Sequence, residues 1–106
     1  MAKAVLRFSR TAWRPAAGAL FDQLQRASLS VQLNIAEGYS MGGAKRFRYH
    51  LRVAYGSAVE TADLLELAGE EGILTEADLT ETLEHSRRAQ RLLLGLLHRP
   101  CTKALQ

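Results

Sequence analysis

A long stretch without proline, filled with helical periodicity, is the feature that most constrains this chain. The two prolines, Pro15 and Pro100, lie near its ends, so the residues between them include no helix breaker of that kind. Within this stretch apolar residues recur at spacings of three and four, which places them on one face of a helix. No segment keeps the two-residue alternation of a half-buried strand. The chain is therefore expected to be all-α.

Three long helices are predicted from this periodicity. The first covers about residues 17–37, and Gly38 is expected to stop it. The second covers about residues 44–69. The third covers about residues 75–98, where Thr75 fits an N-cap with an acidic residue at the third helical position.

A fourth, shorter helix is expected within residues 2–14, at the start of the chain, because this segment also offers an apolar face, although a modest one. The links at residues 38–43 and 70–74 are short, and short links make consecutive helices antiparallel. A length of 106 residues indicates one domain. The predicted fold is a single domain, residues 1–106, forming an antiparallel up-down four-helix bundle with a short first helix.

Several kinds of chemistry are not expected. The lone Cys101 cannot form an internal disulfide, and no apolar run approaches the ~20 residues that span a membrane, so a cytoplasmic protein is expected. The histidines at 50, 85 and 98 lack metal-ligand spacing. The carboxylates of residues 60–84 look like a solvated face instead of an acid–base pair. We expect no catalytic residue, metal or cofactor, no enzyme activity and no membrane partner.

Charge is divided into blocks along the chain, although the net charge is only +3. Residues 1–52 carry nine basic and two acidic side chains, residues 53–86 carry nine acidic and no basic ones, and residues 87–106 carry five basic and no acidic ones. A helical hairpin folded about Gly72 would gather the acidic block at its tip and the basic blocks toward the other end. The bundle is therefore expected to be electrically polarised along its length.

One basic segment, Gly42-Gly43-Ala44-Lys45-Arg46-Phe47-Arg48, combines glycines, the free N–H groups of a helix start and three cations. Such a combination can hold a phosphate or sulfate, although it does not match a Walker loop. A flexible turn with solvated charges is the alternative interpretation. The candidate residues for binding nucleic acid or another anion are Lys45, Arg46, Arg48, Arg52, Arg87, Arg88 and Arg91.

The segment Ser28-Leu29-Ser30-Val31-Gln32-Leu33-Asn34-Ile35-Ala36-Glu37-Gly38-Tyr39 resembles the signature of a known four-helix-bundle family. This family includes proteins encoded in intervening sequences of bacterial large-subunit ribosomal RNA genes. Three departures are a glutamine at position 32, where the family usually has proline, Gly42-Gly43 in place of the usual polar turn, and a shorter stretch before residue 20. The likeness continues through Lys45, Phe47, Ala54, Gly56-Ser57, Glu60, Gly72-Ile73-Leu74 and Leu94-Gly95-Leu96-Leu97.

The resemblance implies a four-helix bundle that assembles as a homopentamer. In a related branch, the accessory variability proteins of retroelements, a basic pentamer binds a reverse transcriptase and nucleic acid. The family signature in this chain is interpreted as a structural lock, with a direct ligand site as the alternative. It comprises Asn34, Ile35, Ala36, Glu37 and Gly38.

The signature also has an interpretation from its spacing. Asn34 and Glu37 are three residues apart and share a helix face. Glu37 is expected to bind Arg46 or Arg48 across the turn, and Asn34 to satisfy backbone groups of the next helix. Gly56, among small neighbours, is expected to allow close helix approach.

Three functions remain open from the sequence. The first is a homo-oligomer, by resemblance a pentamer, that binds RNA or DNA through its basic bundle ends. The second is an adapter or scaffold without a nucleic-acid ligand, which docks a basic protein partner on an acidic tip made of Glu66, Glu70, Glu71 and Glu76. The third is a mobile-element-derived protein that assembles without a ligand.

Overall fold

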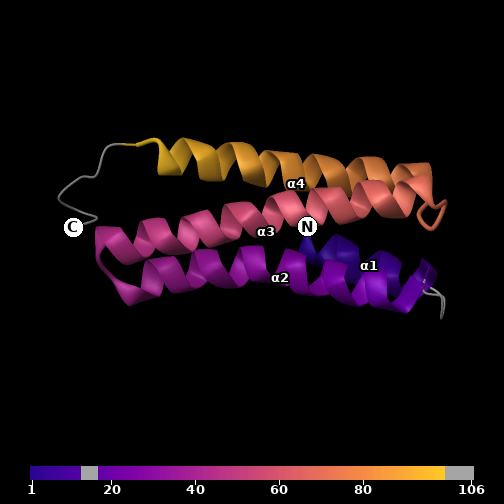
Figure 1. Cartoon of the computed structure of the whole chain (residues 1–106), viewed down its shortest axis with the longest axis horizontal. Coiled ribbons are helices and arrows are strands. Elements are labelled where there is room, and N and C mark those ends of the chain that lie inside the picture. Colours follow the sequence, from indigo (N-terminus) through magenta and orange to yellow (C-terminus); the bar gives the residue numbers. More distant parts are fainter. Residues whose placement is uncertain (13–16, 100–106) are drawn as a thin grey trace.

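The structure is a computed structural model that describes residues 1–12 and 17–99. Its elements are α1 (Ala2–Ala12), α2 (Gly18–Met41), α3 (Ala44–Glu70) and α4 (Glu76–Leu97) (Figure 1). The described ranges contain no strand. The prediction of an all-α four-helix bundle with a short first helix is therefore confirmed, while Trp13 and Arg14, which the sequence placed in that helix, lie outside the described residues.

Contacts between helices establish their up-down order. Between α2 and α3, the Oγ atoms of Ser30 and Ser57 lie 2.8 Å apart, and Asn34 Oδ1 lies 3.0 Å from His50 Nδ1. Residue numbers thus rise on α2 as they fall on α3, which makes the two helices antiparallel (Figure 1). Contacts between α3 and α4 show the same reversal, with Ala58 bonded to Ser86 and Arg48 bonded to Leu97.

The end of α2 differs from the sequence expectation. Gly38 does not stop the helix but lies buried within it, where an added Cβ would lie 3.2 Å from His50 Cβ and 3.6 Å from the Phe47 ring. The missing side chain therefore lets α2 and α3 approach closely. The helix ends instead at Gly42 and Gly43, whose φ angles of 70° and 82° favour glycine.

Gly56 does not provide the close helix approach that the sequence predicted. It is exposed on α3, and an added Cβ would meet nothing within 4 Å. Close helix approach is provided by Gly38 and by Gly69, where an added Cβ would lie only 2.5 Å from the Leu79 side chain. Small residues in a sequence indicate that close packing is possible, but only the phase of the helix decides which of them faces a neighbour.

The turn between α3 and α4 follows standard capping chemistry. The N–H groups of Ile73 and Gly72 donate to the carbonyls of Ala68 and Gly69 at 2.9 and 3.0 Å, the pattern of a Schellman motif with glycine in the left-handed region. Thr75 Oγ1 then accepts a hydrogen bond from the backbone N–H of Asp78 at 3.1 Å, which confirms the predicted N-cap of α4.

The buried core is divided into two clusters along the bundle. We call the end at residues 71–75 the hairpin end, and the end at Gly42 and Gly43 the glycine-turn end. All four helices supply the cluster near the hairpin end, which contains Val5, Phe8, Ala17, Phe21, Leu24, Leu65, Ala68 and Leu74, with Leu79 and Leu83 packed against it.

The second cluster lies toward the glycine-turn end. Its buried residues come from α2, α3 and α4 alone: Val31, Phe47, Leu51, Ala54, Ala58 and Leu93. Helix α1 has only 11 residues, and it lies beside the half of the bundle nearer the hairpin end (Figure 1). One half of the molecule is therefore a four-helix bundle, and in the other half only three described helices pack together (Figure 1).

Candidate nucleic-acid interface

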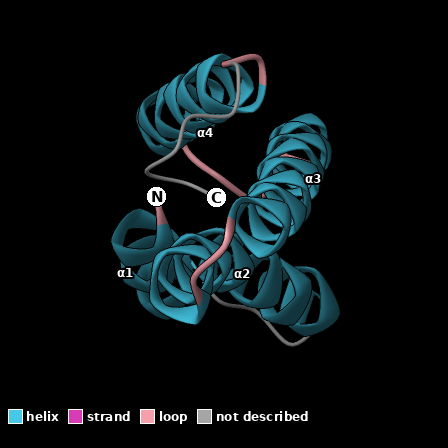
Figure 2. Ribbon diagram, turned by 90° about the vertical axis from the view of Figure 1, so that its left-hand side faces the viewer, coloured by secondary structure: helices cyan, strands magenta, loops and turns pink. Residues whose placement is uncertain are grey.

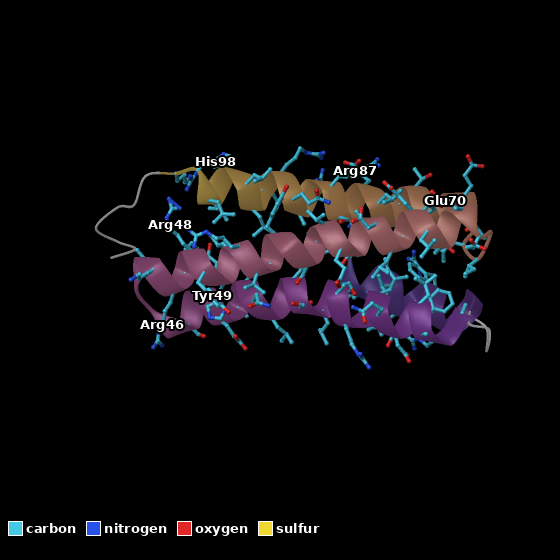
Figure 3. All side chains as sticks on the ribbon, in the orientation of Figure 1. Arg46, Arg48, Tyr49, Glu70, Arg87 and His98 are labelled. Carbon is cyan, nitrogen blue, oxygen red and sulfur yellow. The ribbon has the colours of Figure 1, made fainter. Side chains whose placement is uncertain are left out.

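Basic and acidic side chains lie at opposite ends of the bundle. Arg46 and Arg48 lie at the glycine-turn end, as does His98, whereas Glu70 lies at the hairpin end and Arg87 lies between the two ends (Figure 3). This arrangement follows from the antiparallel order, because the start of α3 and the end of α4 meet at the same end. The sequence predicted that all the basic blocks gather toward the glycine-turn end, and this holds for Arg46 and Arg48 but not for Arg87 (Figure 3).

Lys45 and Arg46 occupy the first turn of α3 and are exposed. The N-cap residue of α3, Gly43, provides no side-chain cap, so the first backbone N–H groups of this helix have no capping side chain. Neither cation forms an ion pair with a described residue, and neither do Arg52 and Arg88, which are also exposed. Cations at a helix start oppose the helix dipole, so their placement is unfavourable until an anion binds there.

Arg48 has a different position. Its guanidinium nitrogens Nη1 and Nη2 donate to the carbonyl oxygens of Leu97 and Arg99 at 2.6 and 2.7 Å. A cation at these last carbonyls both satisfies hydrogen-bond acceptors and complements the dipole of α4. Arg48 therefore fastens the end of α4 to the start of α3, a role that the sequence did not indicate.

The candidate arginines on α4 lie farther along the bundle. Arg87 is ten residues before Leu97, which corresponds to about 15 Å along a helix. Arg87 pairs with Glu66 at 3.5 Å, and Arg91 pairs with Glu84 at 3.2 Å. Exposed pairs of this kind contribute at most about 1 kcal/mol each, so a phosphate can compete for either arginine. The structure thus separates the candidate cations of residues 45–52, near the start of α3, from those of residues 87–91, which lie farther along the bundle on α4.

The family-signature residues form a polar network between α2 and α3. His50 Nδ1 lies 3.0 Å from Asn34 Oδ1 and 3.7 Å from Glu37 Oε2. Asn34 Nδ2 donates to the carbonyl oxygen and the Oγ of Ser30 at 2.9 and 3.1 Å. Because the amide oxygen can only accept, this arrangement requires a proton on His50 Nδ1.

This network corrects two sequence expectations. Glu37 lies against His50 instead of pairing with Arg46 or Arg48, and Asn34 bonds to its own helix and to a side chain instead of to the backbone of α3. No sequence signal indicates His50, because its partners are 13 and 16 residues away and the contact depends on the tertiary register. The network is half-buried and packs under Gly38, so it can lock the two helices together.

The acidic tip is largely unpaired. Glu66 pairs with Arg87, but Glu70, Glu71 and Glu76 are exposed and form no ion pair with a described residue. In the described ranges, no group of three or more histidine, cysteine, aspartate and glutamate side chains could hold a metal ion. None of the described helices combines the length and the apolar character needed to cross a membrane.

Comparison with known proteins gave one match. The model of the family described as 23S rRNA-intervening sequence protein matches residues 1–95, which include α1, α2, α3 and most of α4. The searches of curated proteins and of solved structures found no match. The resemblance inferred from residues 28–39 and the later motifs is confirmed.

Proposed function

Because the chain belongs to the 23S rRNA-intervening sequence protein family, we propose that it is a non-enzymatic, single-domain cytoplasmic protein that assembles as a homopentamer and binds RNA or DNA through its basic end. The observation that carries the nucleic-acid proposal is the pair Lys45 and Arg46, exposed at an uncapped helix start without an acidic partner among the described residues. Free backbone N–H groups at a helix start, with cations nearby, favour the binding of a phosphate.

Assembly would strengthen this binding. Each chain carries a formal charge of +3, and a ring of parallel subunits would gather the exposed cations of every glycine-turn end on one side. Contacts of this type involve phosphates and not base edges, so the binding would be insensitive to sequence and sensitive to salt.

The first test compares two double variants of equal charge. Lys45→Glu with Arg46→Glu is expected to weaken binding of a short structured RNA about tenfold or more and to reduce the salt slope by about two, because two phosphate contacts are lost. The control, Lys3→Glu with Arg10→Glu, changes the net charge equally but lies on α1. Fluorescence anisotropy over a series of salt concentrations measures both quantities.

The two variants separate local contact from overall charge. Equal weakening by both pairs would mean that RNA responds only to net charge, and unchanged binding by the Lys45 and Arg46 variant would remove the glycine-turn end from the interface. Binding of a basic protein that depends on Glu70, Glu71 and Glu76, without any RNA binding, would favour the adapter function instead.

The outer face of α2 supports the assembly part of the proposal. Leu29 and Leu33 are 48% and 51% exposed, lie one turn apart, and are followed one turn later by Ala36. Leu29 also lines a hollow of about 380 Å³ together with Leu6 of α1, which is itself exposed. An apolar stripe of this kind is typical of a surface that another protein covers.

The assembly prediction is tested by mass. The parent chain is expected to form a particle of five times its 11.7 kDa mass, and Leu29→Glu with Leu33→Glu is expected to give single chains, because a buried contact would then hold unpaired charges. Light scattering measures the mass, and Leu67→Glu on α3 is the matched control at another exposed leucine. A monomeric parent would contradict the assembly, and an intact particle in the double variant would place the interface elsewhere.

A further inference from the structure

One edge of α4 faces α1. Arg7 of α1 pairs with Glu81 at 3.1 Å and lies 3.9 Å from Asp78. At 1.5 Å per residue, α1 is about 16 Å long and α4 about 33 Å, so α1 covers only part of this edge. Toward the glycine-turn end, the views show no described helix beside α4 on this side (Figure 1 and Figure 2).

The remaining residues of this edge follow from helical spacing. Positions three and four residues apart share a face, so the edge that begins with Asp78 and Glu81 continues along α4 through His85, Arg88, Leu92 and Leu96. Arg99, just beyond the end of α4, lines the same hollow as these two leucines. The charge of the edge therefore changes sign along α4, from acidic beside α1 to basic beyond it. We call the part from Arg88 to Arg99 the uncovered edge.

The uncovered edge is apolar as well as basic. Leu92 is 64% exposed, and Leu96 is half-buried against the second core cluster. Both leucines line a hollow of about 380 Å³, whose other residues are Arg91, Gly95 and Arg99. Two leucines between arginines suit the apolar face of a helix with acidic flanks, because a phosphate backbone would leave the leucines without an apolar partner.

Charge complementarity specifies the occupant. Where the edge is acidic, it is matched by α1, whose charged side chains are Lys3, Arg7 and Arg10. Where the edge is basic, the matching helix must be acidic. Two segments of the same chain do not fit this description. Residues 100–106 contain no acidic side chain, and the acidic block of residues 53–86 already lies in α3, the following turn and α4.

We propose that the uncovered edge binds an acidic amphipathic α-helix of a partner protein, which lies in line with α1 and completes the fourth position of the bundle. The stretch from Arg88 to Arg99 is about 17 Å long, which corresponds to about three turns of the bound helix. The leucines of α4 meet the apolar face of that helix, and Arg88 and Arg99 meet its carboxylates. This surface is distinct from the Lys45 and Arg46 site, and the proposal does not depend on nucleic-acid binding.

The test uses two labelled synthetic peptides of about 15 residues with the same leucines at helical spacing. In one peptide glutamates flank the leucines, and in the other lysines replace the glutamates. Fluorescence anisotropy with the full chain is expected to show at least tenfold tighter binding of the glutamate peptide. Leu92→Ala is expected to weaken this binding about tenfold or more, since truncation removes apolar surface that the bound helix would bury.

A charge swap makes the test specific. Arg88→Glu with Arg99→Glu is expected to reverse the preference, so that the lysine peptide binds better than the glutamate peptide. Lys45→Glu with Arg46→Glu is the control and is expected to leave the preference unchanged. Circular dichroism checks that Leu92→Ala remains folded, as an exposed leucine predicts.

Three outcomes would overturn the proposal. One is equal binding of the two peptides, and another is a preference that survives the charge swap. The third is a change in particle mass caused by the charge swap without peptide, because the edge would then be a contact between copies of this chain.

Discussion

The Phe21→Ala variant is expected to unfold with a free energy about 3–5 kcal/mol below that of the parent chain. The ring of Phe21 is fully buried and lies 5.9 Å from the ring of Phe8, centroid to centroid. It therefore joins α1 to α2 within the cluster near the hairpin end, where Leu65 of α3 also lies. Truncation leaves a cavity there, because packed neighbours relax only partly.

Denaturant unfolding followed by circular dichroism measures this loss. Leu67→Ala is the control, since Leu67 is 45% exposed, lies outside the proposed assembly surface and should change the free energy of unfolding by less than about 0.5 kcal/mol. Total stability for a chain of 106 residues is about 5–15 kcal/mol, so the Phe21 variant is expected to lose a large part of it. A loss below about 1 kcal/mol would contradict the role of this ring in holding α1.

The Gly38→Val variant is expected to lose about 2–3 kcal/mol of stability through overpacking. A Cβ at this position would already lie 3.2 Å from His50 Cβ, and valine adds two methyl groups beyond it. The side chain would push α3 away from α2 and strain the hydrogen bond between Asn34 and His50. Urea unfolding of both proteins gives the difference.

Gly56→Ala is the matched control, because it also replaces a glycine inside a helix. Nothing lies within 4 Å of an added Cβ at Gly56, so alanine should raise stability by about 0.5–1 kcal/mol through its better helix propensity. Opposite signs at the two glycines would support the packing explanation. Stabilisation at both positions would show that α2 and α3 can separate at little cost.

Much of the fold could be predicted from the sequence because helical periodicity is a local signal. Thr75 and Asp78 marked the start of α4, and the predicted spacing of three and four recurs among the buried residues of α3, such as Leu51, Ala54 and Ala58. Gly38 was assigned wrongly as a stop because glycine is typical of both a helix end and a close helix contact. Only the contact with His50 on the neighbouring helix distinguishes a helix end from a close helix contact.

The candidate site was less predictable for a similar reason. The sequence placed Arg46 and Arg48 at one end of the bundle, since that depends only on helix order (Figure 3). It could not show that Arg48 binds the carbonyl oxygens of Leu97 and Arg99, about 50 residues later, or that Arg87 faces Glu66. Such pairings depend on the register between helices, which is set by tertiary packing.

The up-down order of the helices has a kinetic consequence. Nearly every contact described above joins elements that follow one another in the chain, and α1 with α4 is the exception, through Arg7. Topologies with short sequence separation fold quickly, because little loop-closure entropy is lost before contacts form. Because α1 is the first element of the described chain and supplies buried residues to only one of the two core clusters, it can vary in length without rerouting the helices that follow.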